Sequence, residues 1–460
     1  MQYLKHVHFI GILGSGMLAL AKLMVDQGIK ISGEDSQPLS SNLPAWFSQV
    51  AFSQLTEQSL IEKADLVVYS TAIPKGHPSL LLAEKLDKNI IHRSKALDIL
   101  TGSRQLICIT GTHGKTTCSA LMAWIFKTAN QSPSFYIGGI PNQFDAAVSH
   151  VNSKHFIIEA DESDGSLINY MPHGVMITNI EPDHLEHHQS SVDVYNQCFA
   201  SFMQKPQVLI MNADDDTSCK LMTDAQSLNI KTIGFTQNAD YCIKHVAHES
   251  DTQVITIINQ EKEITVLKTP LLGQHNTYNV AMCWLLARTY DIDETAILSA
   301  IKTFNGVGRR NTTVGYLTID QHTIPVIDDY GHHPTECRLM LEEYKRQNKH
   351  IIHVFEPHRF SRFNYFFDAF RDALLLADHT VIMPVFAAGE DANNQLNADD
   401  MCQSLIKHNH PASTFKDNGA LMQYIKQHHQ PNTIVLFQGA GSVTQFAKEL
   451  IKNNQYAATS

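Results

Sequence analysis

Residues 105–117 have the sequence QLICITGTHGKTT, in which an apolar stretch runs into a loop with two glycines, a lysine and three threonines. The stretch from Leu106 to Thr110 predicts a buried strand, and the residues that follow, to about Thr128, predict a helix. Glycines at such a turn let backbone N–H groups face phosphate oxygens, and the helix N-terminus adds positive potential. The Lys115 ammonium can then reach the outer phosphates, and the Thr116 hydroxyl can ligate Mg²⁺. The predicted phosphate-binding loop consists of Gly111, Thr112, His113, Gly114, Lys115, Thr116 and Thr117.

The general phosphate-loop pattern has a further glycine at the position that Ile109 occupies here, so this chain meets the pattern only in part. The alternative explanation for these residues is a glycine-rich structural turn that carries a surface lysine.

Predicted strands and helices alternate on both sides of this loop, which is typical of parallel sheets with crossover helices. We therefore predict an α/β protein with three domains. An N-terminal Rossmann-like domain covers residues 1–101, and a central domain with the phosphate loop and a mostly parallel sheet covers 102–308. A C-terminal Rossmann-like domain covers 309–460. Residues 231–272 differ, because β-branched residues around polar turns predict a small antiparallel patch.

A second glycine-rich turn lies near the N-terminus, where Gly11, Gly14 and Gly16 follow a predicted strand and Asp35 follows the next one. This arrangement resembles a dinucleotide-binding fingerprint and predicts a nucleotide or pyrophosphate site. The spacing departs from that fingerprint at Leu13, where the second glycine is expected. A tight structural turn and the cofactor site of an NAD-dependent oxidoreductase are the alternatives.

Two further polar segments end predicted strands of the central domain. Residues 159–164, EADESD, offer the oxygen ligands that Mg²⁺ prefers, although a solvated acidic loop is the simpler alternative. Residues 178–184 end in His184, which is a candidate metal ligand or a group that orients the reactants. Asn276 and Asn279 lie three residues apart at a predicted helix start, where they can bind a purine or simply cap the helix.

The last segment carries candidate groups for acidic ligands. Arg310 lies at the expected hinge between the second and third domains and can reach a γ-phosphate. Arg359 and Arg362 can hold a small carboxylate through bidentate hydrogen bonds, with a solvated surface position as the alternative. Residues 438–442, QGAGS, follow the last predicted strand and are interpreted as another backbone cradle.

The composition restricts the class of protein. The chain of 460 residues carries a formal charge of −11 and no long basic run, so we expect no nucleic-acid partner. No apolar run approaches the roughly 20 residues of a membrane span, so we expect no membrane partner. The eight cysteines are scattered without a CxxC pair, which indicates a reducing compartment and a cytoplasmic protein.

Taken together, the motifs resemble the Mur ligases. Their order along the chain is the N-terminal glycine turn, GTHGKT, EADESD, TNIEPDH, HNxxN, GVGRR, DDYGHHPTE, PHRFSR and QGAGS. Within that family the motifs are most similar to the member that joins L-alanine to UDP-N-acetylmuramate in peptidoglycan synthesis. The resemblance implies a cytoplasmic ligase that uses ATP and Mg²⁺ and forms the amide through an acyl phosphate. A monomer or a homodimer is expected.

The resemblance also implies a role for each matching residue. Catalysis is assigned to Lys115, His184 and Arg310. ATP is bound by the phosphate loop, Asn276, Asn279, Arg310 and Asp329, and the metal by Thr116, Glu159 and His184, with Glu162 as the alternative carboxylate. The UDP sugar is bound by Gly11, Gly14, Gly16 and Asp35. The amino acid is bound by His332, His358, Arg359 and Arg362.

Two positions depart from the family pattern. Leu13 stands where a glycine is usual, and Glu356 stands where a glutamine is usual. Glu356 and residues 139–144 also resemble the related murein peptide ligase, which attaches L-Ala-γ-D-Glu-meso-diaminopimelate to the same sugar nucleotide in recycling. That activity is the alternative prediction, because it differs only in the amine substrate.

Overall fold

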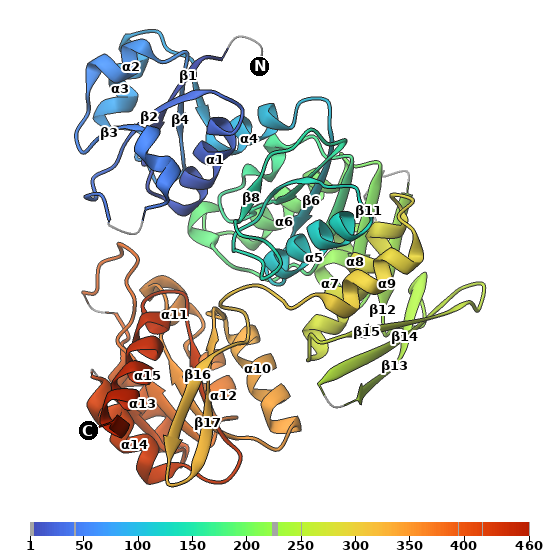
Figure 1. Ribbon diagram of the computed structural model, residues 1–460, viewed down its shortest axis with the longest axis vertical. Coiled ribbons are helices and arrows are strands. Elements are labelled where there is room, and N and C mark those ends of the chain that lie inside the picture. Colours follow the sequence, from blue (N-terminus) through green and yellow to red (C-terminus); the bar gives the residue numbers. More distant parts are fainter. Residues whose placement is uncertain are drawn as a thin grey trace. The chain divides into compact units, whose positions relative to one another are not determined.

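The computed structural model describes residues 4–40, 43–222, 229–249, 251–393, 395–415 and 417–459. The chain divides into two compact units. The first unit comprises Met1–Leu271 and Thr277–Asn305, and the second comprises Leu272–Asn276 and Gly306–Ser460. Two sheets lie in the first unit and one in the second (Figure 1). Each sheet falls within one of the three segments that the sequence predicts, whereas their boundaries as separate domains stay a prediction.

The N-terminal sheet is parallel throughout and has the strand order β3-β2-β1-β4-β5. Both faces are buried, as expected of a parallel sheet. Val7 and Phe9 of β1 pack in the core with α1 and α4, and Ile10 packs on the other face with α2 and α3. The elements are β1 (His6–Ile10), α1 (Ser15–Val25), β2 (Lys30–Glu34), β3 (Ala51–Ser53), α2 (Gln58–Lys63), β4 (Leu66–Tyr69), α3 (Pro78–Lys85), β5 (Ile90–His92) and α4 (Arg93–Thr101).

The central sheet has ten strands in the order β15-β14-β13-β12-β11-β10-β6-β9-β7-β8. Its strands are β6 (Gln105–Thr110), β7 (Ser134–Tyr136), β8 (Val148–Ser149), β9 (His155–Glu159), β10 (Gly174–Ile177), β11 (Val208–Asn212), β12 (Asn229–Gly234), β13 (Tyr241–Glu249), β14 (Thr252–Asn259) and β15 (Ile264–Thr269). Its helices are α5 (Lys115–Thr128), α6 (Val192–Met203), α7 (Asp216–Met222), α8 (Gln274–Arg288) and α9 (Glu294–Thr303).

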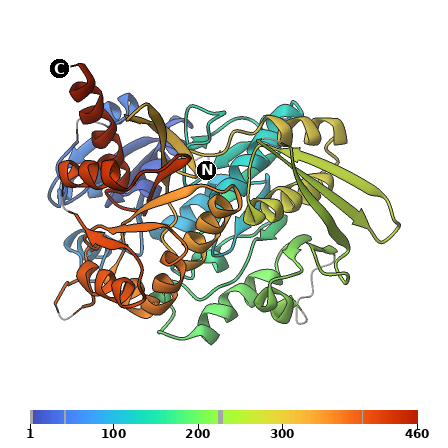
Figure 2. The same ribbon diagram turned by 90° about the horizontal axis from the view of Figure 1, so that it is seen from below.

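The antiparallel patch predicted near residues 231–272 is confirmed. Strands β13, β14 and β15 pair antiparallel at one edge of the central sheet (Figures 1 and 2), while β13 pairs parallel with β12. The mostly parallel central sheet is confirmed as well, because β6 pairs parallel with both β9 and β10. The carboxyl ends of these parallel strands therefore lie at one edge, where open α/β sheets bind ligands.

One hydrophobic core joins the two sheets of the first unit. Buried residues of α1 and α4, such as Leu20 and Leu97, belong to the same cluster as Leu106 of β6 and Phe156 of β9. Tyr136 of β7 adds a polar link, because its hydroxyl donates a hydrogen bond of 3.0 Å to the carbonyl of Gly16. The N-terminal glycine turn is thus held against the central sheet.

The second unit contains a six-stranded sheet of order β16-β17-β21-β18-β19-β20, which is parallel except for the β16–β17 pair. Its strands are β16 (Thr312–Ile319), β17 (His322–Asp329), β18 (His350–Phe355), β19 (His379–Ile382), β20 (Ala412–Thr414) and β21 (Thr433–Gln438). Its helices are α10 (Pro334–Arg346), α11 (Phe360–Tyr365), α12 (Phe367–Leu374), α13 (Ala398–Lys407), α14 (Asn418–His428) and α15 (Val443–Thr459). The predicted α/β class is therefore confirmed for all three sheets.

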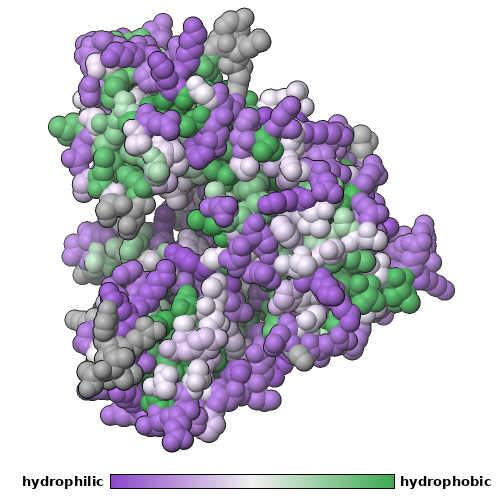
Figure 3. Space-filling view, in the orientation of Figure 1, coloured by the Kyte–Doolittle hydropathy of each residue, from purple (hydrophilic) through white to green (hydrophobic). Residues whose placement is uncertain are grey.

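Hydrophilic residues cover most of the face seen in Figure 3, and hydrophobic residues form small patches between them. Among the residues that the structure describes, no helix combines the length and the hydropathy that crossing a membrane requires.

Candidate active site

The phosphate loop connects β6 to α5 in a conformation that requires glycine at two positions. Gly111 has φ +124° and Gly114 has φ +85°, values that residues with a side chain rarely adopt. A Cβ on Gly111 would lie 2.3 Å from Thr178 Oγ1, and a Cβ on Gly114 would lie 2.5 Å from Asn279 Oδ1. The predicted adenine-binding Asn279 thus lies directly beside the predicted phosphate loop.

Residues after β10 brace the first part of the loop. The backbone N–H of Thr112 donates to the Asn179 carbonyl at 3.0 Å, and the N–H of His113 donates to Asn179 Oδ1 at 2.9 Å. The Thr112 hydroxyl donates to the Glu181 carbonyl at 3.0 Å. The loop is therefore rigid before any ligand arrives, and the first N–H groups of α5, which have no partner within a helix, are the donors best placed for an anion.

Lys115 is held by its own loop and by a buried carboxylate. Its Nζ donates to the carbonyls of Gly111 at 2.6 Å and Thr112 at 3.1 Å, and to Glu162 Oε1 at 2.9 Å. Burial opposes the charged form of Lys115, but Glu162 and Asp161 outweigh it and raise the lysine pKa. Burial raises the pKa of Glu162 to about 7, although Lys115 acts against this shift. The loop therefore holds the Lys115 ammonium against two carbonyls and a buried acidic side chain, and its predicted contact with phosphate stays a prediction.

Thr116 and Glu159 form the pair expected of a magnesium site. The Thr116 hydroxyl donates to Glu159 Oε1 at 2.8 Å, and Glu159 Oε2 accepts a hydrogen bond of 2.6 Å from the backbone N–H of Gly138. A Cβ on Gly138 would lie 2.8 Å from Glu159 Oε1, so a larger residue there would displace the Glu159 carboxylate. A hydroxyl and a carboxylate side by side are hard oxygen donors that suit Mg²⁺. The sequence analysis did not single out Gly138 for this contact.

His184 follows β10 in a left-handed conformation with φ +52°. Its backbone N–H donates to Asp183 Oδ1 at 2.9 Å, and its Nε2 lies 3.7 Å from Asp183 Oδ2. A nearby carboxylate is the usual means of orienting a ligating or reacting imidazole. The predicted metal role of His184 stays a prediction.

The N-terminal glycine turn is also braced internally. The N–H of Gly11, which has φ +76°, donates to the Glu34 carbonyl at 2.8 Å. Asp35 Oδ2 accepts a hydrogen bond of 3.0 Å from the N–H of Leu13, the residue that replaces the usual glycine. The first turn of α1 begins at Ser15, after the N-cap residue Gly14. The N-terminus of α1 thus lies at the glycine turn, where the sugar nucleotide is predicted to bind.

The acidic segment 159–164 contacts both the phosphate loop and residues of the N-terminal segment. Glu159 and Glu162 contact the phosphate loop, as described above. Asp161 Oδ2 lies 3.5 Å from Arg93 Nη2, and Asp164 Oδ2 accepts a hydrogen bond of 2.7 Å from the Thr71 hydroxyl. Sequence analysis missed Arg93, because it lies in no glycine-rich or acidic motif.

In the second unit, Asp329 organises the end of β17. Its Oδ1 accepts hydrogen bonds from Gly331 N at 2.9 Å and Gln438 Nε2 at 2.8 Å, and its Oδ2 accepts one from Asn311 N at 2.9 Å. Arg310 stacks on the ring of Tyr330 at 4.9 Å and reaches Glu336 with a hydrogen bond of 3.4 Å.

Three of the four residues predicted to bind the amino acid lie close together. The rings of His332 and His358 lie 5.6 Å apart, and Arg362 Nη1 lies 3.4 Å from His358 Nδ1. Arg362 is buried, and His358 stacks on Phe386 with ring centroids 5.4 Å apart. The fourth residue, Arg359, is the N-cap of α11 and has a strained φ of +65°.

Two predicted residues stand at the start of α8. Asn276 Nδ2 donates to the Leu272 carbonyl at 2.8 Å, so it closes the turn that precedes the helix. Asn279 lies one turn further along, beside Gly114. Their role in binding adenine stays a prediction.

The backbone of the QGAGS segment, residues 438–442, binds an internal side chain. The carboxylate of Glu356 accepts hydrogen bonds of 2.8 Å from the N–H groups of Gly441 and Ser442. A Cβ on Gly439 would lie 2.8 Å from the Glu356 backbone oxygen, so the segment closes tightly around this residue. The interpretation as a backbone cradle therefore holds for these N–H groups, and the group that they bind is the internal carboxylate of Glu356, which the sequence analysis did not predict.

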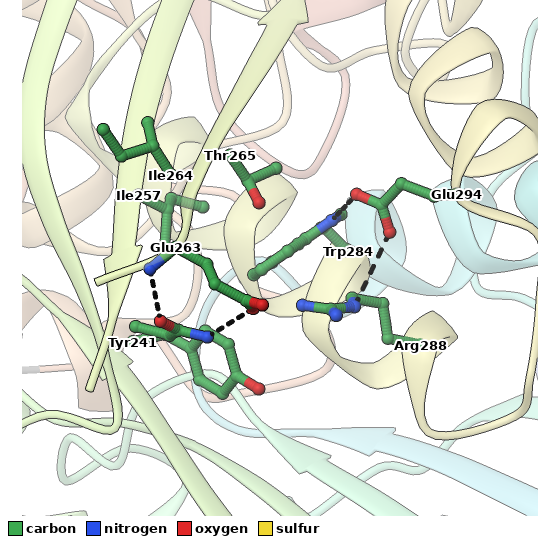
Figure 4. A pocket seen from close by; sticks show the side chains of 9 residues that line it. Tyr241, Ile257, Glu263, Ile264, Thr265, Trp284, Arg288 and Glu294 are labelled. Carbon is green, nitrogen blue, oxygen red and sulfur yellow. Dashed lines mark hydrogen bonds and ion pairs between the residues drawn. The ribbon is translucent and has the colours of Figure 1, made fainter. Parts of the chain in front are cut away.

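A separate pocket of about 350 Å³ lies between the antiparallel strands and the end of α8 (Figure 4). Tyr241 and Trp284 line it, and the Arg288 guanidinium lies 5.0 Å from the Trp284 ring. Glu294 accepts a hydrogen bond of 2.7 Å from Trp284 Nε1. None of the predicted site residues lines this pocket, so it is distinct from the candidate active site.

Comparisons with known proteins agree with this geometry. Three family models match the chain: "Mur ligase family, catalytic domain" at residues 6–105, "Mur ligase middle domain" at 109–287, and "Mur ligase, glutamate ligase domain" at 316–441. The chain is 32% identical to the UDP-N-acetylmuramate–L-alanine ligase of Wigglesworthia glossinidia brevipalpis, over 97% of this chain and 96% of that protein. It is also 32% identical to the ligase of the same name from Protochlamydia amoebophila, over 97% of each chain.

Among solved structures, a UDP-N-acetylmuramate–alanine ligase from Thermotoga maritima is similar, with 25% identity and a TM-score of 0.81 over 98% of this chain and 99% of that chain. A murein peptide ligase from Psychrobacter arcticus shares the fold, with 20% identity and a TM-score of 0.69 over 98% of each chain. The sequence relatives, the family models and the shared fold cover nearly the whole chain, and this protein therefore belongs to the Mur ligase family.

Proposed function

We propose that this enzyme is an ADP-forming ligase that joins the carboxylate of UDP-N-acetylmuramate to the amino group of L-alanine for peptidoglycan synthesis. The supporting observation is the phosphate loop in which Lys115 meets Glu162 and Thr116 meets Glu159, within a chain 32–33% identical to UDP-N-acetylmuramate–L-alanine ligases. We also propose that it acts in the cytoplasm as a monomer or a homodimer.

In the first step, an oxygen of the muramyl carboxylate attacks the γ-phosphorus of ATP, the bond to the β-γ bridging oxygen breaks, and ADP leaves. Such a transfer depends on positioning and on neutralisation of charge. Lys115 supplies one positive charge at the loop, the N-terminus of α5 supplies partial charge, and Arg310 of the second unit supplies another. Asn276, Asn279 and Asp329 hold the nucleotide.

Thr116 and Glu159, whose oxygens lie 2.8 Å apart, are hard donors that would hold a Mg²⁺ ion, with His184 as the third proposed ligand, and the ion would supply positive charge to the phosphates.

In the second step, the amino group of alanine attacks the acyl carbonyl and inorganic phosphate leaves, which forms the amide. The cluster of His332, His358 and Arg362 offers positive or hydrogen-bonding groups that suit the alanine carboxylate. The acyl phosphate reacts with water, so the reacting groups must be shielded while it exists.

The test is phosphate release from ATP with UDP-N-acetylmuramate and Mg²⁺, comparing L-alanine with L-Ala-γ-D-Glu-meso-diaminopimelate. We expect turnover with alanine. Turnover with the tripeptide alone would show that the enzyme is a murein peptide ligase instead. Glu356 is the residue that favours this alternative, because it resembles that ligase at this position. No turnover with either amine would overturn the substrate assignment. Reduction of a nicotinamide cofactor bound at the N-terminal glycine turn would instead support an oxidoreductase.

A further inference from the structure

We propose that Arg93 binds the acidic oxygens of the sugar nucleotide, as a substrate-binding residue of the ligation reaction. This inference rests on the proposed function and extends it to a residue outside the family motifs quoted above. The argument starts from the position of the guanidinium, which lies between the N-terminal glycine turn and the acidic segment 159–164.

Arg93 is packed directly against the first turn of α1. A Cβ on Gly16 would lie 2.2 Å from Arg93 Nη1 and 2.9 Å from the Tyr136 hydroxyl. Glycine at this position therefore makes room for a cation, and Tyr136 fixes the same turn through its hydrogen bond to the Gly16 carbonyl. A positive side chain thus lies within one turn of the helix N-terminus that is predicted to receive the diphosphate.

The guanidinium retains hydrogen-bonding capacity. Arg93 is the first residue of α4, and its side chain is 19% exposed. Its guanidinium lies 3.5 Å from Asp161, whose side chain is 42% exposed, and it also interacts with Asp164 and with the Tyr136 hydroxyl. A guanidinium has five N–H donors in a planar fork that matches carboxylate and phosphate oxygens. The contacts with Asp161 and the Tyr136 hydroxyl do not use all five N–H groups, so donors remain for an acidic ligand.

Asp161 connects this cation to the phosphate loop. Its Oδ2 lies 3.5 Å from Arg93 Nη2, and the next residue, Glu162, accepts a hydrogen bond of 2.9 Å from Lys115 Nζ. The acidic segment therefore links Arg93 to the phosphate loop. An acid bound by Arg93 would be aligned with the loop that presents the γ-phosphate.

Two acidic groups of the sugar nucleotide suit this position, the diphosphate and the muramyl carboxylate. Titration calorimetry distinguishes the two groups. It compares the binding of UDP-N-acetylmuramate with that of UDP-N-acetylglucosamine, which lacks the carboxylate. Because Arg93→Ala removes a charged hydrogen-bond donor, we expect it to weaken binding of UDP-N-acetylmuramate by about 10- to 100-fold. An equal loss for both ligands assigns the diphosphate, and a loss confined to UDP-N-acetylmuramate assigns the carboxylate.

Controls separate binding from folding. Arg93→Lys should recover part of the affinity, and Asp161→Asn should weaken binding less than Arg93→Ala does. Arg104→Ala is the matched control, because Arg104 lies just after the same helix and bonds only to protein groups in the described contacts, at 3.2 Å to the Leu100 carbonyl and 2.7 Å to His150. An ATP analogue should bind every variant as it binds the wild type.

The inference would be overturned if Arg93→Ala bound UDP-N-acetylmuramate within about twofold of the wild type, since a lost charged contact costs more. It would also be overturned if the variant lost affinity for the ATP analogue to the same extent, which indicates a structural role. Failure of the wild type itself to bind UDP-N-acetylmuramate would instead contradict the proposed function.

Discussion

The buried carboxylate of Glu356 accepts hydrogen bonds from the backbone N–H and the hydroxyl of Ser442, 86 residues further along the chain. Its other oxygen accepts the N–H of Gly441 at 2.8 Å, and Glu356 is 1% exposed. The end of β18 is thereby tied to the segment that follows β21. A negative charge inside the protein is satisfied by N–H groups that would otherwise need another anion.

Replacing this carboxylate with an amide should destabilise the second unit. Glu356→Gln keeps the shape but gives up one acceptor, so a buried N–H of the 441–442 turn loses its partner. We expect the free energy of unfolding to fall by about 1–3 kcal/mol, measured by urea denaturation. Glu390→Gln is the control, because Glu390 binds Ser361 in the same way at a more exposed position. If both substitutions lowered the free energy of unfolding equally, the burial of Glu356 would not be the cause of the effect.

Lys115→Ala should remove most turnover and leave the fold intact. The variant loses the charge beside the γ-phosphate, and the buried Glu162, whose pKa is already about 7, can take up a proton when its partner is gone, which limits the damage to the fold. We expect kcat/KM to fall by about 100-fold or more in the phosphate-release assay. Lys127→Ala, at the other end of α5, should keep nearly normal activity. Near-normal turnover of Lys115→Ala would show that the loop does not serve the reaction.

Arg359→Ala should mainly raise the KM for alanine, because it removes a predicted clamp on the carboxylate of the substrate. A rise of about tenfold corresponds to the loss of one charge-assisted hydrogen bond. Arg371→Ala is the control, since Arg371 pairs with Asp368 and Asp372 on the surface of α12. If the alanine KM of Arg359→Ala stayed unchanged, the amino acid would have to bind elsewhere.

A histidine cluster in the second unit should make stability depend on pH. Burial, together with His428 and His350, lowers the pKa of His379 to about 4. The unfolded state therefore binds the proton more readily, and the associated stability is complete above about pH 6.5 and is lost as the pH falls toward 4. Buried His353, with a pKa lowered to about 3, acts in the same direction.

Urea midpoints measured between pH 8 and pH 5 test this expectation. His379→Asn should lose less stability than the wild type over that range, because the group that titrates is gone. His408→Asn replaces an exposed histidine of the same unit and should retain the wild-type dependence. A wild-type midpoint that stayed constant from pH 8 to pH 5 would contradict the prediction.

Local patterns were sufficient to predict much of this molecule. The apolar run before Gly111 and the glycines after it predicted both β6 and the start of α5, because strand period and turn chemistry depend on neighbouring residues. The family resemblance assigned Thr116 and Glu159 to one metal site, and the two side chains are hydrogen-bonded at the ends of adjacent parallel strands. Long-range contacts were not predictable in this way. Arg93 meets Asp161 across 68 residues, and no local pattern indicates that Glu356 fills the turn at 441–442.

The hydrophobic core shared by the two sheets of the first unit has a consequence for how the chain can be divided. Leu20 and Leu97 are buried in a cluster that continues into β6 and β9. A fragment that ended at residue 101 would present this apolar surface to water and tend to aggregate. The two segments should therefore melt together in a single cooperative transition, and expression trials should keep residues 1–305 in one piece.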